Sequence, residues 1–189
     1  RELSLDSART LVQFVHDGVR YARTAFISYP DNVMVLCFKA NAKGMHNLCF
    51  HYAPNPVSTG KMQADGANGL VYRGALDSNG MQYVVRIQAL THGGTLENSG
   101  QTLTIKGADE VVFLITADTD YRINFNPDFH NPKTYVVVQP EVTTEKWMQQ
   151  AAERGYAQLF LRHFKDYSPL FQRVKLQLNA AQTNDKDVP

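Results

Sequence analysis

The segment that begins at Asp118 is rich in oxygen ligands. Asp118 and Asp120 occupy alternate positions, and Asn124, Asn126 and Asp128 follow soon after them. Carboxylate and amide oxygens of this kind can bind Ca²⁺. The spacing lacks the glycine and the terminal glutamate of the familiar calcium loop, so the alternative is that these side chains cap turns.

A second segment combines aromatic rings with polar side chains, and it reads Phe50-His51-Tyr52-Ala53-Pro54-Asn55-Pro56. Aromatic rings beside Asn and His can stack on a sugar ring and hydrogen-bond its hydroxyl groups. Phe50 and Tyr52 share one face of a strand, so they suit a hydrophobic core as well. The spacing favours the core interpretation over the sugar platform.

The other residues that can perform chemistry are scattered. No His-x-x-x-His pair, zinc-type Cys/His cluster, phosphate loop or dinucleotide fingerprint occurs, so the sequence predicts no metal and no cofactor. His163 lies among aromatic residues and is expected to be a hydrogen-bonded packing residue. A lone surface carboxylate is usually a solvated charge, so we assign no catalytic residue. The available carboxylates are Asp65, Asp109, Glu110, Asp118 and Asp120.

Short strands must position these side chains. The chain up to about Val138 reads as all-β, with turn residues at near-regular spacing, and this pattern is typical of an antiparallel β-sandwich. Asp17-Gly18 predicts the first hairpin. Apolar or alternating runs predict strands at 10–16, 19–27, 33–39, 48–52, 70–72, 83–90, 103–106 and 111–116.

The two cysteines lie in neighbouring predicted strands. If Ala42-Lys43-Gly44 forms a three-residue hairpin loop, Cys37 falls opposite Cys49 and the two sulfurs come within reach of each other. Two free buried thiols are the alternative, and they are favoured because two cysteines are too few for a disulfide scaffold.

Helical periodicity appears after residue 140. Thr143 or Thr144 can cap a first helix, and Gly155 separates it from a second one. The second helix carries a broad aromatic stripe that needs a partner surface, and Pro169 interrupts it near its end. We expect three parts: a sandwich domain at 1–140, a helical linker with a final strand from Val174 to Leu178 at 141–178, and a polar tail at 179–189. The stripe consists of Tyr156, Leu159, Phe160, His163, Phe164, Tyr167, Leu170 and Phe171.

Composition limits the partners. The chain has 189 residues, a net charge of +1 and 43% hydrophobic residues, which suits one domain with a substantial core. No block of Lys and Arg occurs, so nucleic acid is not an expected partner. No apolar run approaches the ~18 residues of a membrane helix, so no membrane partner is expected. A signal peptide is not evident in the sequence.

The second helix also resembles the helical linker of glycoside hydrolase family 95, the α-L-fucosidases. Other segments are similar to the strands of that family's N-terminal domain, which normally begins earlier than this chain. The matching segments are Arg1 to Asp6, Asp17 to Tyr21, Phe26 to Asp31, Ala89 to Thr95, Gly107 to Glu110, Asp120-Tyr121, and Arg162-His163, Asp166-Tyr167, Leu170-Phe171 and Arg173-Val174 in the linker.

This resemblance implies a supersandwich domain and a linker that leads toward a catalytic α/α barrel in the same polypeptide. It implies a bacterial, periplasmic or secreted enzyme that removes α-L-fucose from fucosyl-galactose glycans with inversion; some relatives prefer α-L-galactose. The catalytic residues of that family lie on the barrel, so none is transferred to this chain. The loop from 121 to 135 is expected to pack against the barrel or to border its pocket.

Three functions therefore remain open from the sequence. The chain is a noncatalytic scaffold domain of such an enzyme, an autonomous carbohydrate-binding module, or a sandwich that mediates protein contacts. The resemblance of the linker favours the scaffold.

Overall fold

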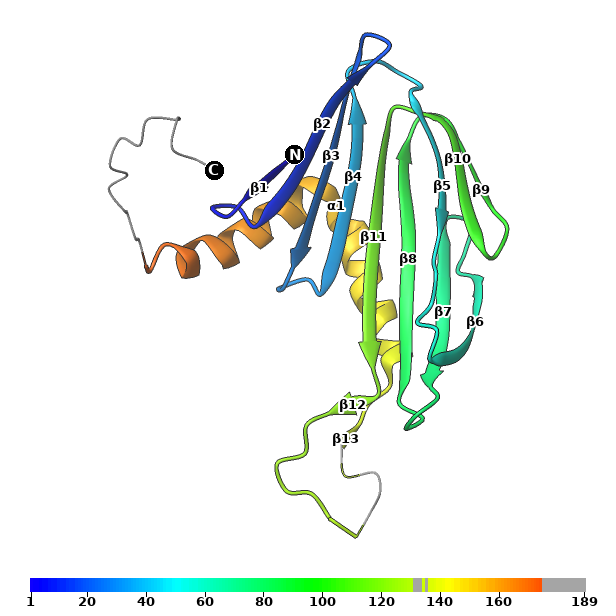
Figure 1. The fold of residues 1–189 in the computed structure, drawn as a ribbon, viewed down its shortest axis with the longest axis vertical. Coiled ribbons are helices and arrows are strands. Elements are labelled where there is room, and N and C mark those ends of the chain that lie inside the picture. Colours follow the sequence, from blue (N-terminus) through cyan, green and yellow to red (C-terminus); the bar gives the residue numbers. More distant parts are fainter. Residues whose placement is uncertain (131–133, 135, 175–189) are drawn as a thin grey trace, which may run out of the picture.

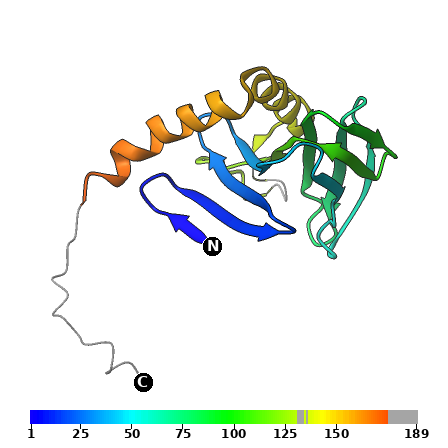
Figure 2. The same cartoon turned by 90° about the horizontal axis from the view of Figure 1, so that it is seen from above.

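The computed structural model describes residues 1–130, 134 and 136–174. A large antiparallel sheet forms the middle of the molecule, with a small sheet on one face and a long helix on the other (Figures 1 and 2). In spatial order, the strands of the large sheet are β1 (Glu2–Ser4), β2 (Arg9–His16), β3 (Val19–Ser28), β4 (Val33–Ala40), β11 (Glu110–Thr119), β8 (Gln82–His92), β7 (Gly69–Leu76) and β6 (Ser58–Ala64).

The small sheet has the order β5 (His46–His51), β10 (Thr102–Ala108) and β9 (Thr95–Asn98). A short pair, β12 (Tyr121–Arg122) and β13 (Val136–Val137), lies at the base of a loop, and the helix α1 spans Pro140–Phe171. The expected mainly-β sandwich with a C-terminal helical part is confirmed.

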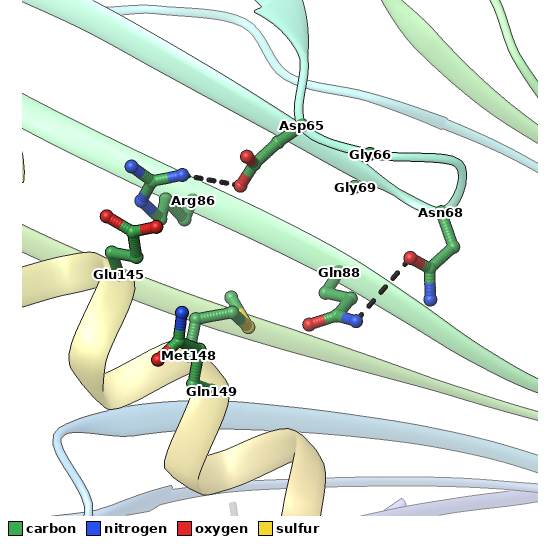
Figure 3. A pocket seen from close by; sticks show the side chains of 9 residues that line it. All are labelled: Asp65, Gly66, Asn68, Gly69, Arg86, Gln88, Glu145, Met148 and Gln149. Atoms are coloured by element: carbon green, nitrogen blue, oxygen red, sulfur yellow. Dashed lines mark hydrogen bonds and ion pairs between the residues drawn. The ribbon is translucent and has the colours of Figure 1, made fainter.

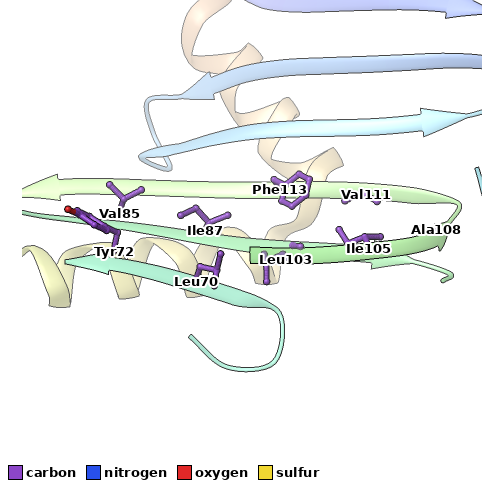
Figure 4. Close-up of a cluster of buried hydrophobic side chains, with 10 residues drawn as sticks. Leu70, Tyr72, Val85, Ile87, Leu103, Ile105, Ala108, Val111 and Phe113 are labelled. Atoms are coloured by element: carbon purple, nitrogen blue, oxygen red, sulfur yellow. The ribbon is translucent and has the colours of Figure 1, made fainter. Parts of the chain in front are cut away.

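Successive side chains of β8 point to opposite faces of the large sheet, and this alternation explains why both faces of the sheet can be buried. Val85, Ile87 and Ala89 point into the core between the two sheets, and Figure 4 shows Val85 beside Tyr72 in the cluster that also contains Leu103 of β10. Arg86 and Leu90, at the intervening positions, belong to the face that α1 covers. A period of two with apolar residues on both faces is what a central strand requires.

Most predicted strands are present within a residue or two of their expected bounds. The apolar pattern predicted neither β6 nor β9, and it also missed the short strands β1, β12 and β13, of which β1 and part of β12 belong to segments that carried the family resemblance. β6 contains Gly60, Lys61 and Gln63 and lies at the edge of the large sheet, where little apolar surface is needed. β9 has only four residues. Neither shows the apolar pattern on which the strand predictions depended.

The hairpin considered for residues 42–44, which would place Cys37 opposite Cys49, does not form. β4 already has a partner on each side, β3 and β11, so the chain after Ala40 crosses to the small sheet and β5 pairs with β10. Gly44 has a left-handed backbone conformation, with φ of 70°, and its N–H donates to Asp109 Oδ1 at 2.7 Å. Both cysteines are free, as favoured, although Cys49 is exposed rather than buried.

The two thiols should differ in reactivity. Burial, reinforced by the nearby Glu110 carboxylate, raises the pKa of Cys37 to about 12, so the thiol stays protonated and inert throughout the neutral range. At pH 8 we expect a thiol reagent such as DTNB to modify one cysteine in the native chain and two after denaturation. The Cys49→Ser variant should show no fast reaction, and rapid labelling of Cys37 in that variant would contradict this assignment.

The helix begins earlier than predicted. Gln139 is its N-cap, without a side-chain hydrogen bond, and Pro140 occupies the first turn, where the missing N–H costs nothing. Thr143 and Thr144 therefore do not cap it: Thr143 bonds Asp118, and Thr144 is buried and donates to the Pro140 carbonyl. No helix within the described residues is long and apolar enough to cross a membrane.

Gly155 bends the helix, so the expected helix pair is present as two segments of α1. Its φ and ψ are 66° and 175°, which is not helical. Figure 2 shows the first segment nearly end-on and the second from the side. Pro169 lies within the last turns before the helix ends at Phe171. Most of the predicted final strand, Val174–Leu178, lies outside the described residues.

We expect Gly155→Ala to destabilise the domain by about 1–3 kcal/mol. This backbone conformation is almost restricted to glycine, and because nothing lies within 4 Å of an added Cβ, the cost is conformational rather than steric. Urea denaturation measures the change. A variant as stable as the parent, or more stable, would show that the bend is not required, since Gly→Ala in a regular helix is stabilising.

Candidate functional site

Asp118, Asp120, Asn124 and Asp128 accept hydrogen bonds from separate protein groups. Asp118 accepts hydrogen bonds from Arg122 and Thr143, and Asp120 is buried and accepts from the Gln82 N–H. Farther along the loop, Asn124 accepts from the Asn126 N–H, and Asp128 from the His130 N–H. The turn-capping alternative therefore describes these two residues. Among the described residues, no group of three or more His, Cys, Asp or Glu is placed to hold a metal ion.

The pKa of Asp118 is lowered. Burial of the carboxyl opposes this change, but hydrogen bonds from Arg122, Thr143 and the Thr119 N–H favour the charged form more strongly. The depressed pKa means that the ionised carboxylate stabilises the fold above the pKa of the unfolded chain. This contribution is lost as the pH falls through the lower pKa of the folded state.

The aromatic residues of the second segment contribute to the core. The Phe50 ring lies 4.8 Å from that of Phe113, and the Tyr52 ring lies 5.3 Å from that of Tyr72, measured between centroids. Both side chains are partly buried against the cluster between the sheets. The core interpretation is confirmed for Phe50, whereas Tyr52 also lines a cavity at the end of the sheet.

The structure does not bring the five available carboxylates together. Asp65, Asp118 and Asp120 line three different cavities. Each of the five has a polar partner of its own: Asp65 bonds Arg86, Asp109 bonds Gly44 and His92, Glu110 bonds Lys39, Asp118 bonds Arg122, and Asp120 bonds Gln82.

A polar pocket of 280 Å³ lies between α1 and the large sheet, next to the buried Arg86. Arg86 is only 4% exposed, and it donates to Asp65 Oδ2 at 2.5 Å and to Glu141 Oε1 in the first turn of α1. Glu141 also receives a bidentate pair from Arg73. Figure 3 shows Glu145, Met148 and Gln149 of α1 on one side of the pocket and Asp65, Asn68 and Gln88 on the other. These ion pairs attach the start of the helix to the sheet.

A second cluster holds both segments of the bent helix. The Asp31 side chain, in the turn between β3 and β4, is fully buried. Its Oδ1 accepts from Arg154 Nη1 at 3.0 Å and from Arg162 Nε at 2.8 Å, and its Oδ2 accepts from the Ser28 hydroxyl at 2.7 Å. Because Arg154 precedes Gly155 and Arg162 follows it, one carboxylate binds the helix on both sides of the bend.

His163 is a packing residue, as expected. It is 4% exposed, its ring stacks on Phe26 at 5.1 Å, and its Nε2 lies 2.9 Å from the Ser7 carbonyl oxygen. This contact attaches the N-terminal segment to the second half of α1.

The aromatic stripe is only partly covered by the sheet. Leu159 is fully buried, and Tyr156 and Phe160 pack against the cluster around Phe26. The end of the stripe remains exposed, at Phe164, Leu170 and Phe171. It adjoins a largely apolar cavity of 480 Å³ between the helix and the first strands, lined by residues that include Tyr29, Met34 and Tyr167.

Sequence reasoning missed the residues that fix the helix. Asp31 and Arg162 belong to segments that carried the family resemblance, but their contact spans 131 positions and leaves no local pattern. Arg86 did leave a signal, since a single charge stands within the apolar run Tyr83 to Leu90. Such a charge in a central strand indicates a buried ion pair.

The fold and these contacts define a β-sandwich domain with a rigidly attached helix and an apolar surface left open at its end. Domains of this class occur at the N-terminus of glycoside hydrolases. The family model described as "Glycosyl hydrolase family 65, N-terminal domain" matches residues 1–124. The chain therefore belongs to this family of N-terminal domains.

Two curated relatives are glycosidases by name. The chain is 25% identical to "Alpha-L-fucosidase 2" of Arabidopsis thaliana, over 98% of this chain and 24% of that protein. It is 28% identical to "Probable alpha-fucosidase A" of Aspergillus niger, over 94% of this chain and 23% of that protein. The chain thus spans about a quarter of the length of these relatives.

A solved structure shares the fold. It is described as "Putative kojibiose phosphorylase from human microbiome", and it matches 90% of this chain and 24% of its own length with a TM-score of 0.56. Its sequence identity to this chain is 8%, so the likeness concerns the fold alone.

Proposed function

We propose that this chain is the noncatalytic N-terminal domain and linker of a secreted or periplasmic α-L-fucosidase of glycoside hydrolase family 95. The parent enzyme would remove terminal α-L-fucose from fucosyl-galactose glycans by inverting hydrolysis. The domain would serve as a scaffold that positions a catalytic barrel. Its own carboxylates would take no part in the reaction.

The observation that carries this proposal is the pattern of coverage. Nearly the whole chain matches two proteins named as fucosidases, and it accounts for about a quarter of each. The remaining three quarters of such a protein provide ample room for a catalytic domain. The separation of Asp65, Asp118 and Asp120 into different cavities also supports a noncatalytic role, because inverting hydrolysis needs two carboxyl groups that face one substrate.

The exposed part of the helix supports the docking role. An apolar surface remains on the C-terminal part of α1, which follows the sandwich in the sequence. It consists of the exposed side chains of Phe164, Leu170 and Phe171. Phe125 and Phe129 in the loop after β12 are almost fully exposed. Exposed aromatic side chains gathered on one domain commonly mark an interface. We infer that the barrel covers both surfaces.

Release of fucose tests the proposal. The 189-residue chain and a gene product extended through the downstream region are each incubated with a fucosyl-α-1,2-galactose and, in separate reactions, with an α-L-galactoside, and the fucose or L-galactose released is measured. We expect fucose from the extended product alone. Fucose release by the 189-residue chain would contradict the noncatalytic role. Preferential cleavage of an α-L-galactoside by the extended product would overturn the fucosidase assignment in favour of an α-L-galactosidase.

A further inference from the structure

A cavity of 420 Å³ lies at the end of the large sheet, where β7 turns into β8 and β11 ends (Figure 1, bottom). Tyr52 and Asn55, from the segment after β5, form part of its lining, and Thr119 at the end of β11 forms another part. The two segments that the sequence singled out for sugar binding and for oxygen ligands therefore meet at one site. Its volume is within the range of ~300–1,000 Å³ that is usual for small-molecule sites.

Two tyrosine rings form the apolar part of this cavity, together with Leu76 and Met81. The rings of Tyr52 and Tyr83 lie 5.3 and 5.6 Å from that of Tyr72, which is 3% exposed. Both cavity rings thus pack against the buried Tyr72. Aromatic side chains fixed in this way present preformed apolar surface at a small entropic cost.

The cavity carries no unbalanced charge. Asp118 is one of its lining residues, but both carboxylate oxygens are already occupied: Oδ1 accepts from the Thr119 N–H and Arg122 Nη2, and Oδ2 from Arg122 Nη2 and the Thr143 hydroxyl. The guanidinium of Arg122 neutralises the carboxylate. A cationic ligand would therefore gain no ion pair with Asp118. A neutral ligand needs no such ion pair, so its binding is not weakened by the pairing of Asp118 with Arg122.

Three neutral polar groups remain free to bond a ligand. The Tyr52 hydroxyl and the Asn55 Nδ2 have no hydrogen-bond partner among the described residues, and Thr119 accepts from the Tyr121 N–H but keeps its own proton to donate. Burial, with smaller contributions from Tyr83 and Tyr72, raises the pKa of Tyr52, so its hydroxyl remains a neutral donor. The cavity combines an aromatic wall with uncharged donors and acceptors.

We propose that this cavity is a binding site for a neutral saccharide ring. The C–H face of the ring rests on the tyrosine rings, and its hydroxyl groups bond Tyr52, Asn55 and Thr119. An aromatic surface bordered by neutral hydroxyl and amide groups matches a molecule that has both apolar faces and many hydroxyl groups. This assignment goes beyond the scaffold role, because it gives the domain an affinity of its own that does not depend on the reaction of the parent enzyme.

Calorimetric titration of the 189-residue chain with L-fucose, D-galactose, D-glucose and fucosyl-α-1,2-galactose tests the site. The cavity variant is Tyr52→Phe/Asn55→Asp, which removes one hydroxyl and one amide donor but keeps the ring and the Oδ1 that accepts from the Val57 N–H. The control is Tyr29→Phe/Asn124→Asp, which makes the same two chemical changes outside the cavity.

We expect at least one of these sugars to bind, and the cavity variant to bind it about tenfold more weakly or worse, since two hydrogen bonds are lost. The control variant should keep the parent affinity, and circular dichroism and thermal melting should be alike for the three proteins. Absence of binding to all four sugars in the millimolar range would overturn the proposal. Equal affinity of the cavity variant and the parent chain would do the same.

Discussion

Replacing both Arg154 and Arg162 with alanine is expected to lower the free energy of unfolding by about 3–5 kcal/mol. In the unsubstituted chain the Asp31 side chain is fully buried, and the double change leaves the Ser28 hydroxyl as its remaining side-chain partner. A buried carboxylate that loses both cations is more costly than a broken exposed ion pair, because the water admitted by the two alanines replaces the lost ion pairs only in part. Each single variant retains one arginine, so its effect should be well under half of that of the double variant.

Urea denaturation followed by circular dichroism measures these differences. The matched control is Lys146→Ala/Lys165→Ala, which removes two cations from the same helix that form no ion pair in the described part of the chain. It should change the stability by no more than about 0.5 kcal/mol. Strict additivity of the two arginine substitutions would argue against a shared role at Asp31.

Removing the two carboxylates around Arg86 is the second change with a large expected effect. We expect Asp65→Ala/Glu141→Ala to destabilise the domain by about 3–5 kcal/mol, because the guanidinium, 4% exposed, would lose both of its charged partners. The converse change should be mild. In Arg86→Met the two carboxylates remain, and since they are 38% and 36% exposed, water can hydrate them. We expect this variant to lose about 1 kcal/mol or less.

The asymmetry between these variants is the decisive measurement. Thermal and chemical denaturation of both are compared with the control Glu153→Ala/Asp166→Ala, which removes two exposed carboxylates from the same helix outside this pocket. If Arg86→Met were as unstable as the double carboxylate variant, the stability contributed here would come from the attraction between Arg86 and its carboxylates. It would not come from the penalty of leaving a buried charge unpaired.

The sequence predicts the strands well because their apolar residues follow a period of two. In β8 and β11 the pattern is reinforced on both faces, and the turns Asn79-Gly80 and Gly93-Gly94 separate the strands clearly. β6 lacks this signal because it is an edge strand with few apolar side chains. Local pattern thus predicts strands with an apolar run or alternation, including the largely exposed β2, and misses strands such as β6 and β9 that lack one.

Partner choice between distant elements is a different matter. The error at Cys37 and Cys49 came from pairing consecutive strands, whereas β4 pairs with β11, which lies about seventy positions farther along the chain. The cluster at Asp31 depends on contacts across 123 and 131 positions. The tyrosine cavity likewise needs the ends of β5, β7 and β11 to meet. The sequence singled out Tyr52, Asn55 and Asp118 but not the residues around Asp31, and the convergence of each site depends on the topology of the sheets.

The bend at Gly155 has a mechanical consequence. A helix can swing at a bend only if the residues beside the bend are free to move. Here Arg154 and Arg162, on the two sides of Gly155, are bound to one carboxylate in the turn between β3 and β4. A torque applied to the last turn of α1 would therefore not be absorbed as hinge motion at the glycine. It would pass through Asp31 into the sheet, so the end of the helix and the sandwich would rotate together as one stiff body.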